Sequence, residues 1–120
     1  MTADGPSNTI QLTVSSKRAR AHGELVVQAP MAALPPAVER ALAGLPRMTL
    51  TAIWRERAEI VAGGNWKSFG AVIVLSFEPI DARTTRVSAA STPNVPTTLF
   101  DYGQGKADVT EVLRAVAAEL

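Results

Sequence analysis

The middle of the chain carries a run, Ala71–Phe77, that is apolar at nearly every position and follows a turn-forming segment, Gly63–Gly70. A run rich in Val, Ile and Phe and bounded by Gly and Pro is typical of a central strand that is covered on both faces. We therefore expect residues 69–77 to form the middle strand of a sheet. Gly63–Asn65 contains residues that tolerate positive φ, which predicts a tight reversal into that strand.

Five other segments have the alternating or β-branched composition of strands. They are Thr9–Ser15, Glu24–Ala29, Met48–Trp54, Ala58–Ala62 and Thr84–Ser91. Charged residues separate the third from the fourth, so residues 54–62 have two interpretations, a hairpin or one long bent strand.

Connecting segments are expected where polar, Gly and Pro residues gather. The basic segment Lys17–Gly23 is predicted to be a connector that turns at Gly23 and contains His22. Pro79–Arg83 is predicted to be a turn, and Ser91–Thr98 a loop.

Two segments have the apolar spacing of three and four residues that predicts amphipathic helices. The first is Pro35–Ala43, with Pro at its start and Gly44 just after its end. The second is Lys106–Leu120, whose apolar stripe is set against a polar face that includes Asp108. A helix this amphipathic is expected to lie on the sheet.

These elements predict an α+β fold. Consecutive strands joined by short turns pair antiparallel, so we expect a meander sheet of about five to six strands. The long C-terminal helix and the shorter helix near residues 35–43 are expected to pack on one face. Residues 1–8 are predicted to be a disordered tail, and residues 9–120 a single domain.

Composition narrows the function classes. The chain has 120 residues, of which 47% are hydrophobic, so a substantial core is expected. Twelve basic and eleven acidic residues give a net charge of +1, which argues against a nucleic-acid binder. Without cysteine, disulfides and thiolate chemistry are excluded. Because no segment resembles a signal peptide or a membrane span, we expect a cytoplasmic protein.

Aromatic and polar residues supply the candidate ligand-binding set. Aromatic side chains with a few polar groups line many small-molecule sites. The candidate lining residues are Trp54, Trp66, Ser68, Phe69 and Tyr102. The alternative is structural, because a Trp beside a Gly-Gly-Asn turn commonly caps the edge of a core.

Gly103, Gly105 and Lys106 open the C-terminal helix and form a candidate anion site. Backbone N–H groups at a helix start can hold a phosphate. In the alternative interpretation, the glycines turn the loop into the helix while Asp101 accepts hydrogen bonds from backbone N–H groups.

The sequence selects no catalytic set, no metal site and no cofactor. His22 is the single histidine, and no serine lies in a Gly-x-Ser-x-Gly elbow. Arg55, Arg57, Lys67 and Arg86 could meet on one sheet face, but interleaved glutamates favour a solvated face of mixed charge.

The order of elements, with the amphipathic helix last, resembles a shortened member of the helix-grip superfamily, which includes START-type and related lipid-binding domains. The segments Trp66–Gly70 and Asp101–Gly103 look like those of small uncharacterised bacterial proteins of this type. The resemblance is architectural and covers roughly residues 23–120. It implies a sheet gripping the last helix.

Two functions of different classes follow. The first is a non-catalytic module that binds a small apolar ligand between the sheet and the C-terminal helix. The alternative is a protein-interaction or homodimerisation module that uses an exposed sheet edge, for which Thr9–Ser15 is the candidate. An enzyme ranks behind both.

Overall fold

The computed structural model describes residues 9–17, 20–63, 70–94 and 103–120. The predicted tail, residues 1–8, lies outside them. The elements in chain order are β1 (Thr9–Lys17), β2 (Arg20–Val27), the 3₁₀ turn η1 (Met31–Ala33), α1 (Leu34–Ala43), β3 (Met48–Ile53), β4 (Arg57–Ala62), β5 (Ala71–Asp81), β6 (Thr84–Pro93) and α2 (Gln104–Ala118).

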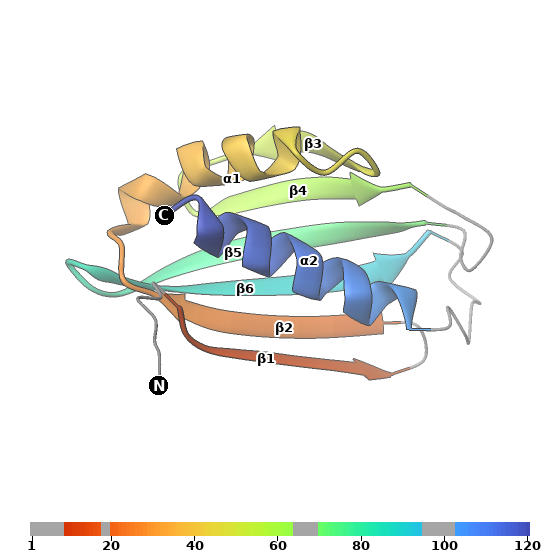
Figure 1. Cartoon of the computed structure of the whole chain (residues 1–120), viewed down its shortest axis with the longest axis horizontal. Helices are drawn as coiled ribbons and strands as arrows, with labels where there is room; N and C mark the ends of the chain where they lie inside the picture. The colour runs from red at the N-terminus through yellow and green to blue at the C-terminus, as the bar shows by residue number, and fades with distance from the viewer. Residues whose placement is uncertain (1–8, 18–19, 64–69, 95–102) are drawn as a thin grey trace.

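The six strands form one antiparallel sheet in the order β1-β2-β6-β5-β4-β3. Strands β3 to β6 form a meander, and the β1–β2 hairpin joins it by pairing β2 with β6 (Figure 1). The predicted α+β class and the central position of β5 are confirmed. Residues 54–62 form the hairpin alternative, because β3 and β4 pair antiparallel across the Trp54–Glu56 turn.

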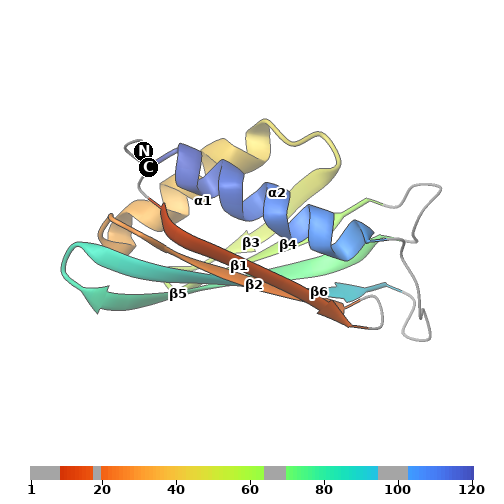
Figure 2. The same ribbon diagram turned by 60° about the horizontal axis from the view of Figure 1, so that its bottom comes forward.

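Both helices lie on the same side of the sheet (Figure 2). Helix α2 runs obliquely across the strands from β2 and β6 towards α1 (Figure 1). Its apolar stripe, Val109, Val112, Leu113 and Val116, is completely buried. The predicted packing of both helices on one face is therefore confirmed.

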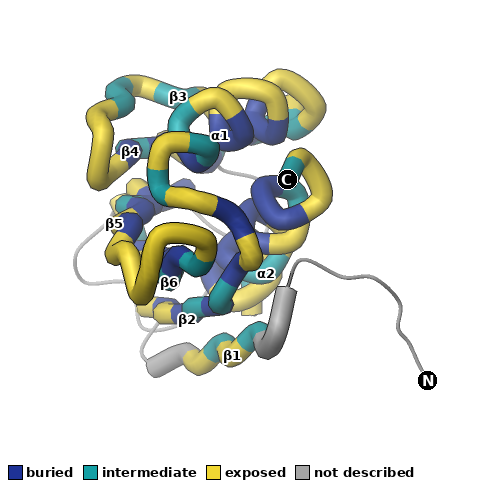
Figure 3. Tube along the Cα trace, turned by 90° about the vertical axis from the view of Figure 1, so that its left-hand side faces the viewer, coloured by how far each residue is buried: buried dark blue, intermediate teal, exposed yellow. Residues whose placement is uncertain are grey.

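The prediction that β5 is covered on both faces is wrong. Ile73, Leu75 and Phe77 are buried under the helices, whereas Val72 on the opposite face is 38% exposed. Figure 3 shows buried and exposed positions alternating along the strands. The reason is the antiparallel topology: two helices on one face leave the other face to solvent. We call the helix-covered side the inner face and the other the outer face.

The predicted turn at Gly23 is also wrong, and the connector Lys17–Gly23 is shorter than expected. Arg20–Gly23 belong to β2, where Gly23 pairs with Val14 and Ala89. A Cβ at Gly23 would lie 2.8 Å from Val109 Cγ1, so this glycine permits α2 to approach the sheet closely.

Two other connectors are partly strand. Strand β5 continues through Pro79 to Asp81, with an irregularity in register between these residues. Strand β6 continues to Pro93, which shortens the predicted loop Ser91–Thr98. Proline is tolerated in a strand where its missing N–H coincides with an irregularity or a strand end.

The outer face carries mixed charge, as expected. Arg86 forms ion pairs with Glu78 at 2.7 Å and with Glu24 at 3.7 Å, and Arg57 pairs with Glu59 at 2.6 Å.

Within the described ranges, neither α1 nor α2 is a helix of the length and hydrophobicity that crossing a bilayer requires.

Candidate functional site

The inner face is lined by small side chains at one end of the sheet, where β4 and β6 finish and β2 and β5 begin. We call this end of the sheet the Ala71 end. Along β5 the inward residue is a phenylalanine at Phe77, branched aliphatic at Leu75 and Ile73, and only a methyl group at Ala71. The neighbouring strands continue this floor of small residues with Ala21, Ala62, Ala89 and Ser91, all buried.

A partly buried ion pair joins α2 to the segment before β3 at this end. Arg47, which lies just before β3, donates through Nη1 to Asp108 Oδ1 of α2 at 3.0 Å. Gln104 Nε2 donates to the same carboxylate oxygen at 2.7 Å, and Arg47 Nη2 donates to the carbonyl of Gly63. The Asp108 side chain is 3% exposed, so its charge depends on these partners. The contacts tie the start of α2 to β3 and to the end of β4.

The prediction that Asp108 lies on the polar face of the last helix is wrong. It lies beside Val109 and one turn before Val112, on the buried side of α2. A carboxylate within an apolar stripe is the signal that could have identified it from the sequence. Arg47 carries no comparable signal, because it contacts Asp108 from 61 positions away.

Among the described side chains, two buried polar atoms have no hydrogen-bond partner, Ser91 Oγ and Arg47 Nε. Both residues lie at the Ala71 end. A buried hydroxyl without a partner costs on the order of 1–3 kcal/mol, so such an atom calls for an explanation. Ser91 is 2% exposed and points to the inner face between Ala21 and Ile73, its neighbours across β2 and β5.

The structure places Trp54 away from this end. Trp54 follows β3 at the hairpin, whereas Met48, at the other end of β3, pairs with Ala62. Trp54 is 46% exposed, and the guanidinium of Arg57 lies 5.3 Å from the centroid of the Trp54 ring. Trp66, Ser68, Phe69 and Tyr102, the other predicted lining residues, are outside the described residues.

The predicted anion-binding residues open α2. Gly103 has φ of 80°, which suits glycine, and its carbonyl accepts a hydrogen bond from the N–H of Ala107 at 3.0 Å. Gly105 is buried and Lys106 is exposed, so the two lie on different sides of the helix. Anion binding by these residues stays a prediction.

Comparison with known proteins shows the fold alone. The chain matches no family model and no curated protein. It resembles EF2215 from Enterococcus faecalis, a conserved protein of unknown function, at 8% identity and a TM-score of 0.50, covering 89% of this chain and 75% of that one. A second similar structure is the di-domain ARO/CYC BexL from the BE-7585A biosynthetic pathway, at 16% identity and a TM-score of 0.48.

The BexL match covers 83% of this chain, which spans 45% of the length of that structure. The arrangement of sheet and last helix is helix-grip-like, in agreement with the resemblance noted in the sequence. These similarities establish no family membership.

Proposed function

We propose that this chain is a non-catalytic module that binds a small, largely apolar ligand between the sheet and the start of α2. The observation that carries the proposal is the buried hydroxyl of Ser91, which has no partner among the described residues. Ligand sites combine an apolar lining with a few polar groups that fix orientation. Ser91 among alanine side chains has this composition.

The chemistry of the site favours a ligand with one polar atom on an apolar body. Ala21, Ala71 and Ala89 offer apolar contact, and Ser91 Oγ offers one donor and acceptor group. At the rim, the charge of Arg47 is balanced by Asp108, so this ion pair provides no net charge for an ionic ligand. A ligand atom bonded to Ser91 would satisfy the hydroxyl.

The proposal is tested with Ser91→Ala and a matched control, Ser88→Ala. Ser88 lies on the same strand but on the outer face. Removing an unsatisfied hydroxyl is expected to leave the free protein as stable as before, or to stabilise it by about 1 kcal/mol. A library of apolar alcohols and ketones is screened against both variants and the unaltered chain by thermal shift and native mass spectrometry.

A ligand at 100 times its dissociation constant adds about 2.7 kcal/mol to the free energy of unfolding. We expect a hit that binds the chain and Ser88→Ala equally and binds Ser91→Ala about tenfold more weakly, the loss typical of one hydrogen bond. Equal binding to all three proteins would place the ligand elsewhere, and no hit in the library would count against the module itself.

The homodimerisation alternative is favoured by one observation, the position of β1 at the edge of the sheet. An edge strand presents backbone groups that a second copy can pair with. The same native mass spectra decide this alternative, because a dimer at micromolar concentration supports it and a monomer at all concentrations contradicts it.

A further inference from the structure

A pocket lies on the outer face at the Ala71 end, on the opposite side of the sheet from the site proposed above. Its volume is about 310 Å³, near the lower limit for small-molecule pockets. Strands β1, β2 and β6 form it. Ser15, His22 and Ala90 occupy one row across these strands, because Ser15 pairs with His22 and His22 pairs with Ala90.

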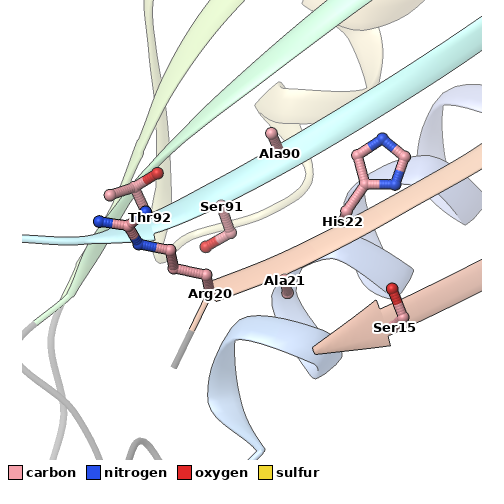
Figure 4. A pocket seen from close by; sticks show the side chains of 7 residues that line it. All are labelled: Ser15, Arg20, Ala21, His22, Ala90, Ser91 and Thr92. Carbon is pink, nitrogen blue, oxygen red and sulfur yellow. The ribbon is translucent and has the colours of Figure 1, made fainter. Parts of the chain in front are cut away.

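The pocket exists because a methyl group stands between longer side chains. Arg20, His22 and Thr92 rise around Ala90, and the side chain of Arg20 reaches across towards Thr92 (Figure 4). Ala21 and Ser91 complete the lining, but they are buried and belong to the inner face.

The described lining residues are rich in hydrogen-bond donors and include no acid. Arg20 supplies a guanidinium, His22 an imidazole, and Ser15 and Thr92 hydroxyl groups. None of the ion pairs found among the described residues involves Arg20.

Two arginines within the strands of this face, Arg57 and Arg86, differ from Arg20. Arg57 is neutralised by Glu59, and Arg86 by Glu78 and Glu24. Glu24 is two positions from His22 on the same strand, yet it is directed to Arg86. The pocket therefore holds a positive charge beside hydrogen-bond donors, with no carboxylate among its lining residues.

An apolar strip borders the pocket on β5. Val74 pairs with Ala90, and Val72, which is 38% exposed, pairs with Thr92. On β4, Val61 pairs with Val72 and is 36% exposed. A ligand that held an anionic group at Arg20 would lay an adjoining apolar part along these valines.

We propose that this outer pocket binds a small organic carboxylate. Its carboxylate accepts hydrogen bonds from the Arg20 guanidinium and from Thr92, and its apolar body lies over Ala90 towards Val72 and Val74. A guanidinium matches the two oxygens of a carboxylate in a bidentate arrangement, which fixes the orientation of the ligand.

The probe is sodium benzoate, titrated into the ¹⁵N-labelled full chain and followed by amide chemical shifts. Benzyl alcohol supplies the same ring without charge, and inorganic phosphate supplies charge without the ring. We expect saturable shifts at residues 20–22 and 90–92, with a dissociation constant on the order of 1 mM. Both comparison compounds are expected to bind about tenfold more weakly.

Two variants and a control locate the ligand. Arg20→Gln is expected to weaken benzoate binding about tenfold, as loss of a charged hydrogen bond does. Ala90→Leu fills the pocket and is expected to abolish saturation. Arg114→Gln, an exposed arginine of α2 on the other side of the sheet, is expected to bind benzoate as the unaltered chain does.

Three results would overturn the proposal. They are an absence of saturation up to roughly ten times the expected dissociation constant, equal binding by Arg20→Gln and Arg114→Gln, and phosphate binding as tight as benzoate binding. The last would show that the pocket recognises charge alone.

Discussion

The close approach of α2 to the sheet at Gly23 predicts that Gly23→Ala destabilises the protein. A Cβ at this position would lie 2.8 Å from Val109 Cγ1 and 3.0 Å from both the Thr13 carbonyl oxygen and Val14 Cγ2. Carbon atoms in contact are normally 3.5–4.0 Å apart. Because Thr13 contributes backbone and Val109 is β-branched with a fixed rotamer in a helix, neither neighbour can move freely.

The size of the effect follows from two opposing terms. Overpacking of a well-packed core costs typically 1–3 kcal/mol. Replacing Gly by Ala reduces the entropy of the unfolded chain and restores about 0.4–1 kcal/mol. The net loss in free energy of unfolding is therefore about 1–2 kcal/mol, which corresponds to a fall in Tm of several degrees in a domain of this size. Urea unfolding followed by far-UV circular dichroism measures it.

A matched control is Gly44→Ala. A Cβ at Gly44 would meet only the carbonyl oxygen of Ala41, at an ordinary 3.7 Å, and the residue has a negative φ of −95°. The control is expected to show no comparable loss of stability. If Gly23→Ala proved as stable as Gly44→Ala, α2 would not lie against β2 at this position, and the reasoning about the inner site would fail with it.

A double-mutant cycle identifies the atom responsible. Val109→Ala removes Cγ1, the atom nearest to the added methyl group, so Gly23→Ala is expected to cost less in that background. Residues in direct contact show coupling free energies of at least about 0.5 kcal/mol. Strict additivity of the two substitutions would show that Val109 is not the neighbour that the new methyl group meets.

Two further predictions concern charged groups. Asp108→Asn leaves Arg47 without a carboxylate partner, but Arg47 is 34% exposed and partly screened by water, so we expect the free energy of unfolding in urea to fall by about 2 kcal/mol. The control Glu119→Gln, in an exposed pair with Arg40, is expected to lose less than about 0.5 kcal/mol. Equal losses would contradict a buried role for Asp108. The pKa of the Asp81 carboxyl is lowered below its usual range by the backbone N–H of Arg83, which donates to it at 2.8 Å, and by the Thr84 hydroxyl. The contribution of Asp81 to stability is therefore present above its unfolded-state pKa and is lost as pH falls through the lower folded-state pKa. An NMR titration midpoint of Asp81 at or above its value in the urea-unfolded chain would refute the turn geometry.

Local periodicity was sufficient to predict most of the elements. The spacing of Val109, Val112 and Val116 predicts a helix because one face of α2 must lie on apolar material, whatever that material is. Alternation along Thr84–Ser91 likewise predicted β6, with Val87 and Ala89 inside. These patterns depend only on the geometry of a single element.

The covering of β5 was mispredicted because a residue in a strand can be apolar for two reasons: it is buried, or its side chain suits the strand conformation. Val72 and Val74 are apolar on a face that no helix covers. Valine suits a strand through its branched side chain and its cross-strand contacts, here between Val72 and Val61, even when a third of its surface is exposed. An apolar run therefore predicts a strand more reliably than it predicts cover on both faces.

The candidate sites were beyond prediction because long-range pairing creates them. Arg47 and Asp108 are far apart in the sequence, and no local pattern connects them. The outer pocket requires Arg20 and Thr92 to be neighbours, which depends on β6 returning to pair with β2. A basic connector containing His22 gave no reason to expect a strand whose alternate residues face two different sites.

That alternation has a consequence for both proposed ligands. Ala21 and Ser91 face inward, while their sequence neighbours His22, Ala90 and Thr92 face outward, so the two sites share one layer of backbone. A ligand on either face would shift the amide signals of the same residues, and the shifts alone would not show which face is occupied. The variants do distinguish the faces, because Ser91→Ala removes a hydroxyl from a side chain that faces inward, whereas Arg20→Gln changes a side chain that faces outward. An apolar ligand that responds to the first variant and benzoate that responds to the second would establish two independent sites on opposite faces of the sheet.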